Sequence, residues 1–441
     1  MTEFSALITD LKKLLSEDTR IVRSEETISR WDISCSPDSV ITVFPRCERD
    51  VSEIIKFCSE KKLKCFAQSG GHVDEASQSV TLGGGTLISE LIEEVTKKKL
   101  EVATGVCNSV GALGSLLYGG TGRHIGKYGY GIDNLLSINL VDATGKLHQN
   151  VNETTDPELW WAIRGAGASF GIVTQATIKA YPQSNNGLSW ICTLIFSEPS
   201  ASKLEMILSA ISETEMNENM SLQFSFAYLP PTLLPTVIVV PWYYGPQSEA
   251  EKAWARLLDP NLQPTLVEPV ITSANKLNEG NDVLGEKGGK KPVVGLGLDN
   301  IDPVAFREIW DLWVKFVSEN PDAVKSGVFV ERFYKSKALE VSDDATVFPY
   351  ANRAINYEAI CVPSYNDDAL GGKVQHFTQS IREIWLQKCN NTQKPRSYGA
   401  SAGLNEPLES LFGDQEKIER LLRIKKRWDP QNNWGALFDF P

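Results

Sequence analysis

Gly105-Val-Cys-Asn-Ser-Val-Gly111 is the most informative stretch of this 441-residue chain, and it continues through Gly119-Gly-Thr-Gly122 to Gly129-Tyr-Gly-Ile-Asp-Asn134. Glycine lacks a Cβ, so closely spaced glycines let main-chain N–H groups approach a ligand that side chains would hold away. A single cysteine, Cys107, lies among these glycines. The stretch therefore predicts a backbone cradle for a flat or phosphorylated group.

A second tract combines a helix start, a glycine turn and a strand. Asp156 and Pro157 suit the cap and the first turn of a short helix that runs to Arg164. Gly165-Ala-Gly-Ala-Ser-Phe-Gly171 then predicts a turn, and the apolar alternation from Ile172 predicts a strand. The two tracts together indicate an α/β lobe with its glycines at the turns.

The composition indicates a globular protein large enough for two packed domains. Its net charge of −12 disfavours nucleic acid and anionic membrane surfaces as partners. The chain has no run of about 18 apolar residues and no recognisable secretory signal. The eight cysteines lack metal-like spacing, so they are predicted to be reduced thiols. We therefore expect a cytoplasmic protein without a membrane span, whose partner is a small-molecule substrate.

Two patterns of secondary structure divide the chain. The first part alternates short elements: strands at 41–44, 64–67 and 135–142 and helices at 51–61 and 87–99. From about residue 185, longer apolar runs predict an antiparallel sheet, with strands at 188–196, 221–228, 236–240 and 327–334 and helices at 250–258 and 303–319. A helix at 416–427 is predicted in the tail.

These tracts resemble the berberine bridge enzyme-like, FAD-linked oxidases of the vanillyl-alcohol oxidase superfamily, from Val43-Phe-Pro-Arg46 to the tail segment Trp428-Asp-Pro-Gln-Asn-Asn-Trp434. The resemblance implies an α+β, two-domain PCMH-type FAD-binding fold with an antiparallel-sheet substrate domain. Residues 1–183 would form the FAD-binding domain, residues 184–395 the substrate domain, and residues 396–441 a segment that returns to the FAD domain. It also implies oxidation of a natural-product intermediate by hydride transfer to flavin N5, with oxygen as the final acceptor.

The resemblance also assigns cofactor-binding residues. A histidine matching His72 carries a covalent bond to the flavin 8α-methyl group in similar proteins, and a cysteine matching Cys107 carries a second bond to C6. Other contacts with FAD are implied for Ser69, Gly70, Gly71, Val110, Gly111, Gly119, Gly120, Gly122, Gly171, Ile172, Val173 and Asn433. Turn glycines, a turn histidine and a small buried thiol are the alternative interpretation.

Tyr398 and Glu358 are the candidates for proton transfer. Tyr398 matches the tyrosine that the family has before Glu406-Pro407, although Ala400 replaces the family's asparagine two residues later. Its phenol could orient a substrate or exchange a proton, or it could be a core tyrosine. Glu358, like Glu331 and Arg332, is a charge within an apolar strand and must be solvent-facing or paired.

The chain departs from the family pattern after His72. Only Val73-Asp-Glu-Ala-Ser-Gln-Ser-Val-Thr-Leu82 precedes the next glycine turn, where relatives have a longer pyrophosphate loop and a further strand. Asp74 and Glu75 would also place negative charge beside an anionic pyrophosphate. Missing coding sequence, a shortened flavin site, or a redox-neutral cyclase or isomerase that has lost flavin would each account for this. A non-catalytic small-molecule binder is a further alternative.

Overall fold

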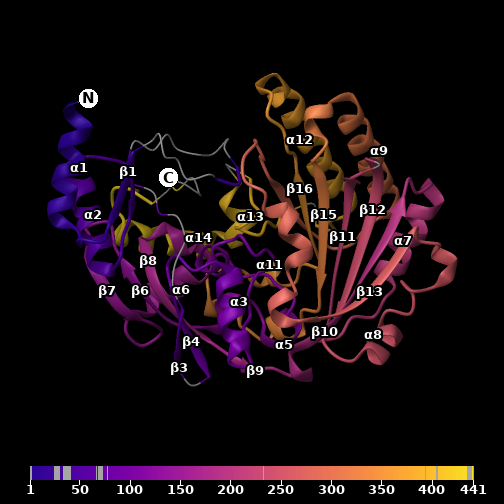
Figure 1. Cartoon of the computed structure of the whole chain (residues 1–441), viewed down its shortest axis with the longest axis horizontal. Helices are drawn as coiled ribbons and strands as arrows, with labels where there is room; N and C mark the ends of the chain where they lie inside the picture. The colour runs from indigo at the N-terminus through magenta and orange to yellow at the C-terminus, as the bar shows by residue number, and fades with distance from the viewer. Residues whose placement is uncertain are drawn as a thin grey trace.

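Two antiparallel sheets, of five and seven strands, lie side by side in the computed structural model of the chain (Figure 1). The structure describes residues 2–23, 30–32, 41–65, 67, 73–76, 78–231, 233–392, 394–403, 406–434 and 440. This arrangement of helices and antiparallel sheets confirms the predicted α+β fold.

The five-stranded sheet lies in the first lobe and has the order β3 (Val73–Ala76), β4 (Ser79–Gly83), β8 (Ile172–Lys179), β6 (Leu135–Val141) and β7 (Leu147–Val151). Its core also contains side chains from α3 (Ile88–Lys97), α4 (Ala112–Leu116), α6 (Pro157–Ala166), α13 (Leu408–Phe412) and α14 (Gln415–Trp428). Asp156 caps α6 by accepting a hydrogen bond of 2.9 Å from the Leu159 N–H, as predicted. Because α13 and α14 contribute to this core, the chain's tail packs against its first third.

The seven-stranded sheet forms the second lobe. Its order is β13 (Leu266–Ser273), β10 (Leu188–Ser197), β12 (Leu234–Tyr243), β11 (Met220–Leu229), β15 (Gly327–Phe333), β16 (Tyr357–Val362) and β14 (Val294–Leu298). Helices α7 (Ala201–Ser212), α9 (Pro303–Glu319) and α12 (Gly371–Lys388) pack on one face. Phe226 meets Trp310 there edge-on, with ring centroids 5.0 Å apart. Phe226 and Tyr357 both belong to this helix-covered core.

The remaining elements are short or peripheral. The pair β1 (Arg20–Arg23) and β2 (Ile41–Phe44) lies beside α1 (Thr2–Leu14) and α2 (Glu48–Glu60), and β5 (Leu100–Glu101) pairs with β9 (Tyr181–Pro182). Other short helices are α5 (Ile125–Tyr128), α8 (Gln247–Ala253), α10 (Ser336–Leu339) and α11 (Tyr350–Arg353). Among the helices of the described residues, none has both the length and the apolar character needed to cross a bilayer.

Two local predictions are wrong. The described residues of the expected strand at 64–67, which are Lys64, Cys65 and Ala67, lie outside any strand. Val73–Ala76, in the segment expected to lack a strand that relatives have, forms β3 and makes a hairpin with β4, which pairs with β8. A strand needs a neighbour for its N–H and C=O groups. In the part of the chain that the structure describes, β3 forms the edge of the five-stranded sheet, and residues 64, 65 and 67 pair with no strand.

Candidate functional site

The seven-stranded sheet has two chemically different faces around β15 and β16. Val330 and Ala359 lie in the helix-covered core and are 0% and 1% exposed. Because side chains alternate along a strand, the next residues, Glu331 and Glu358, face the opposite side. They are direct cross-strand partners in the register of the two strands. The sheet therefore places two carboxyl groups next to each other on the face away from its helices.

A lysine and a tyrosine hold Glu358, which is 6% exposed. Lys335 Nζ lies 2.9 Å from Glu358 Oε1 and donates a hydrogen bond of 2.7 Å to the hydroxyl of Tyr130. That hydroxyl donates to Glu358 Oε1 at 3.4 Å. Burial, followed by the negative charge of Glu358, raises the pKa of Tyr130 well above its ordinary value. The phenol therefore keeps its proton at neutral pH and serves as a donor.

A buried ion pair fixes the turn that carries Tyr130. Asp133 Oδ2 accepts a hydrogen bond of 3.0 Å from the Tyr130 N–H. Both Asp133 oxygens also bind Arg353, at 2.7 and 2.8 Å, in a two-pronged pair. Arg353 comes from α11 and is 0% exposed. The glycine-rich stretch of the first lobe is thus anchored directly to the second lobe.

Tyr398 lies in the same region as Glu358. The two residues line one narrow crevice together with Gly297 and Ile355. The Tyr398 hydroxyl accepts hydrogen bonds from the main-chain N–H groups of Gly120, at 3.0 Å, and of Thr121, at 3.2 Å. Burial raises the pKa of Tyr398, so this phenol also stays protonated at neutral pH. The structure thus brings the two predicted proton-transfer residues together.

The glycines of the first lobe make room for its own chain in several places. Gly119 has φ +136°, and a Cβ there would lie 2.6 Å from Cε2 of Tyr398. A Cβ on Gly122 would lie 1.8 Å from the carbonyl oxygen of Thr104. A Cβ on Gly171, which has φ +155°, would lie 2.4 Å from the carbonyl oxygen of Val141. Close protein packing alone therefore requires glycine at these positions, whatever else they contact.

One feature of the glycine stretch suits a flat cofactor ring, and another is already used by the protein itself. The N–H groups of Gly120 and Thr121 converge on one oxygen atom, the hydroxyl of Tyr398. Cys107 is partly exposed, and Val110 is 39% exposed. The accessible edge suits a flat ring such as the isoalloxazine of FAD, whereas the two N–H groups already have the Tyr398 hydroxyl as their acceptor.

The other residues predicted to contact FAD are placed as follows. Gly111 precedes α4, and Ile172 and Val173 begin β8 and pair with Val141 and Leu140 of β6. Asn433 is exposed, and its N–H donates to Asp429 Oδ1 at 2.8 Å. The predictions for Ser69, Gly70, Gly71 and His72 lie outside the described residues. Cofactor contact at all of these positions stays a prediction.

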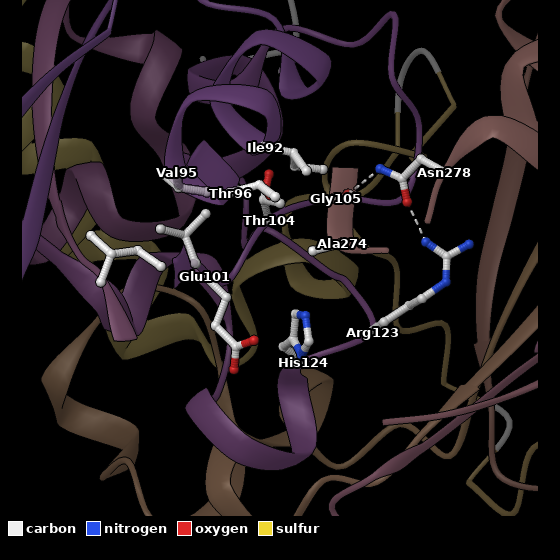
Figure 2. A pocket seen from close by; sticks show the side chains of 12 residues that line it. Ile92, Val95, Thr96, Glu101, Thr104, Gly105, Arg123, His124, Ala274 and Asn278 are labelled. Atoms are coloured by element: carbon white, nitrogen blue, oxygen red, sulfur yellow. Dashed lines mark hydrogen bonds between the residues drawn. The ribbon is translucent and has the colours of Figure 1, made fainter. Parts of the chain in front are cut away.

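A second polar cluster borders a cavity of about 30 Å³ between α3, the 102–105 segment and the second lobe (Figure 2). Glu101 accepts hydrogen bonds from the hydroxyls of Tyr128 and Tyr244. Across the cavity, Arg123 donates to Asn278, whose Nδ2 donates to the Gly105 carbonyl oxygen at 3.3 Å (Figure 2). Both networks join the first lobe to the second.

Burial dominates the electrostatics of this second cluster. It raises the pKa of Glu101, and the two tyrosine hydrogen bonds offset part of that effect. Burial, together with the nearby charges of Lys127 and Arg123, lowers the pKa of His124 to about 3. His124 is therefore neutral at physiological pH, and its Nδ1 has no hydrogen-bond partner among the described residues.

Several residues of the site escaped the sequence analysis. Lys335 carries no motif of its own, and Tyr130 was quoted only as part of the glycine-rich stretch; the two lie 205 residues apart. The one usable signal was the charge within apolar strands, which singled out Glu331, Arg332 and Glu358. Arg332 proved to face the other way, because its Nη1 donates to the carbonyl oxygens of Ile211 and Thr214 at the end of α7.

Comparisons with known proteins agree with this geometry. The family described as "FAD binding domain" matches residues 71–150, which include the glycine-rich stretch. FAD-linked oxidoreductase hasG of Aspergillus fumigatus is 27% identical over 467 aligned positions, which cover 96% of each chain. The sequence likeness therefore extends well beyond the matched domain.

Solved structures show the same fold. BBE-like 1 of Physcomitrella patens superposes with a TM-score of 0.81 over 99% of each chain, at 17% identity. The 6-hydroxy-D-nicotine oxidase of Arthrobacter nicotinovorans has a TM-score of 0.78 and 19% identity, covering 96% of this chain and 98% of that one. The resemblance predicted from the sequence is thus confirmed: the chain is similar to FAD-linked oxidoreductases over nearly its whole length and has the fold of the berberine bridge enzyme-like oxidases.

Proposed function

We propose that the protein is an FAD-linked oxidase of a small organic molecule, with Glu358 as the general base. The observation that carries the proposal is the crevice shared by Glu358 and Tyr398, where the second lobe's sheet meets the glycine stretch of the first lobe. The enzyme class itself, an FAD-dependent oxidoreductase, is the one that the relatives carry in their names. A buried carboxyl group at a junction of two lobes is a common site for acid/base catalysis.

The glycine stretch would hold the cofactor. Gly119, Gly120 and Gly122 would face the ring with their main chain, and Val110 and Gly111 would lie at its edge. His72 and Cys107 would supply the covalent bonds that the family resemblance implies. FAD, when bound, accepts a hydride from the substrate carbon and returns the electron pair to oxygen.

The protein's own groups would handle the proton and orient the substrate. Glu358 takes the proton of a substrate hydroxyl or amine as the hydride leaves, while Lys335 keeps the carboxyl group in place at 2.9 Å. Tyr398 orients the substrate through its protonated phenol. Ile355 gives the crevice an apolar wall. The substrate class, a natural-product intermediate, is the one that the family resemblance implies, and a general base requires that it carry one ionisable group.

The visible spectrum of the purified protein, before and after acid precipitation, tests this proposal. A yellow pellet indicates covalent flavin, and a yellow supernatant indicates flavin that is bound without a covalent link. His72→Ala and Cys107→Ala should each remove one linkage, whereas Cys47→Ala, at an exposed cysteine, should remove none. A colourless protein that takes up no added FAD would overturn the oxidase.

One observation favours a second candidate, a redox-neutral cyclase or isomerase. The Tyr398 hydroxyl already engages the N–H groups of Gly120 and Thr121, and its ring lies against Gly119. A protein without flavin would keep this arrangement, with Glu358 and Tyr398 as its acid/base groups. Turnover by colourless protein without oxygen consumption would identify this candidate. Turnover that consumes oxygen and requires bound FAD would exclude it.

A further inference from the structure

Glu331 is a carboxyl group that the proposed reaction does not yet use. It lies directly opposite Glu358 across the β15–β16 pair, and Gln223 of β11 is its partner on the other side. Directly opposed residues of antiparallel strands have Cβ atoms about 5 Å apart. Glu358 is 6% exposed, whereas Glu331 is partly accessible. Of the two residues, Glu331 is therefore the less buried.

The charges around Glu331 come from three elements. Glu358 on β16 is negative, while Lys335 after β15 and Arg123 before α5 are positive. Burial, and then the charge of Glu358, raises the pKa of Glu331 to about 7, although Arg123 and Lys335 oppose that rise. Two neighbouring carboxyl groups of this kind share one proton near neutral pH. The ion pair with Lys335 places the negative charge on Glu358 and leaves the proton on Glu331.

We infer that Glu331 is the second member of an acid/base pair, which releases a proton to solvent when Glu358 takes one from the substrate. This inference rests on the proposed function of Glu358. Before the step Glu358 is a carboxylate and Glu331 a carboxylic acid, and after it the two states are exchanged. The pair keeps a single negative charge beside Lys335 and Arg123 throughout, and one proton enters as one leaves. A proton then moves from Glu358 to Glu331 and restores the starting state.

Infrared difference spectra across the pH range from about 5 to 9 test the pair in purified protein. The wild type should lose a protonated-carboxyl band with a midpoint near pH 7, which is the ionisation of Glu331. Glu331→Gln should lack this band. Glu268→Gln, at an exposed glutamate of the same sheet, is the matched control and should retain it. A band that persists unchanged in Glu331→Gln would overturn the assignment.

The coupling itself is tested by Glu358→Gln, because glutamine imitates the neutral carboxyl group that Glu358 becomes after taking a proton. Loss of the neighbouring negative charge, with Lys335 and Arg123 still present, should move the Glu331 midpoint down by about one pH unit or more. An unchanged midpoint would contradict the pair. Circular dichroism checks that the variant is folded, and Lys335→Met, which should move the midpoint upward, supplies an independent measurement.

Thermal stability gives a further readout. The pKa of Glu331 is about 7 in the folded chain, above the ordinary value of about 4.3. Its contribution to stability is therefore present at low pH and is lost as the pH rises through about 7. Glu331→Gln should flatten the fall of Tm over this range, and an equally steep fall would count against the inference. These measurements need neither flavin nor substrate, so a colourless protein with an intact pair would refute the oxidase alone.

Discussion

Glu101 and Glu358 are both buried at the contact between the lobes, but only Glu358 has a lysine as a hydrogen-bond partner among the described residues. The turn at 128–134 reaches both, since the Tyr128 hydroxyl donates to Glu101 and the Tyr130 hydroxyl donates to Glu358. Within the described residues, Glu358 also has a cation at hydrogen-bond distance, Lys335, whereas Glu101 has none. Glu358 lines the crevice with Tyr398, and Glu101 lines the small cavity with His124.

The presence or absence of a neighbouring lysine distinguishes a carboxyl group that joins the lobes, Glu101, from one that is proposed to transfer protons, Glu358. Hydroxyl groups satisfy a buried carboxyl group without giving it a charge partner, and burial raises the pKa of Glu101. That arrangement joins the lobes. A lysine beside a carboxyl group, in reach of a second carboxyl group and of a substrate crevice, instead allows protons to move. The same residue types therefore lead to different expected roles.

Removing the two carboxyl groups separately should give the largest contrast. Glu358→Gln should lower the turnover rate by about 10²–10⁴-fold, the usual contribution of a general base. Glu101→Gln should leave the rate within about threefold of the wild type, because Glu101 contacts tyrosines outside the crevice. Oxygen consumption with a substrate that the wild type oxidises measures both. Equal losses in the two variants would remove the distinction.

Breaking the ion pair of the shared turn should damage both clusters at once. Arg353→Met leaves Asp133 buried without its cation and should cost about 3–5 kcal/mol of unfolding free energy. Urea denaturation measures the loss. Arg256→Met, at an exposed pair with Glu213, is the control and should cost less than about 1 kcal/mol. A small effect of Arg353→Met would show that the turn is held by other contacts.

The two clusters should respond to pH with opposite signs. The pKa of His124 is about 3 in the folded chain, below the ordinary value of about 6.5, so its stabilising contribution is present above about pH 6.5 and is lost as the pH falls. His124→Phe keeps an aromatic ring and should remove about 3 kcal/mol of the loss seen between about pH 6.5 and 4. Glu331→Gln should instead remove a loss of stability that develops as the pH rises from about 4.3 to about 7, so the two windows overlap and only the signs differ. Denaturation midpoints measured between about pH 4 and 7 test both directions of change. His376→Phe, at a solvent-exposed histidine, is the control.

Removing one tyrosine hydroxyl should give the smallest effect. Tyr244→Phe takes a hydrogen bond from Glu101 and should cost about 2 kcal/mol of stability with little change in turnover. Tyr130→Phe removes the equivalent hydroxyl beside Glu358 and should alter the pH dependence of turnover as well. Parallel measurements of stability and pH–rate profiles compare the two. The contrast fails if Tyr244→Phe also shifts the rate profile.

Local patterns predicted most secondary structure well. The helix expected at 303–319 is α9, with Asp302 as its cap, because the start signal of a helix lies in adjacent residues. The strand expected at 64–67 failed, since a strand exists only with a partner, and that partner is supplied by another part of the chain. In the candidate site, the family pattern identified Tyr398, and a charge within an apolar strand identified Glu358. The partners that hold them were not identified.

The sequence by itself determined the order of helices and strands, the glycine-rich stretch and the resemblance to FAD-linked oxidases. Each of these depends on residues that are close together in the chain or on their spacing. Only the tertiary structure decided that Glu331 faces Glu358, because one residue of register would have reversed the face. It also decided that Lys335 meets Tyr130 across 205 residues. Such contacts depend on how two lobes pack, and no local pattern encodes that packing.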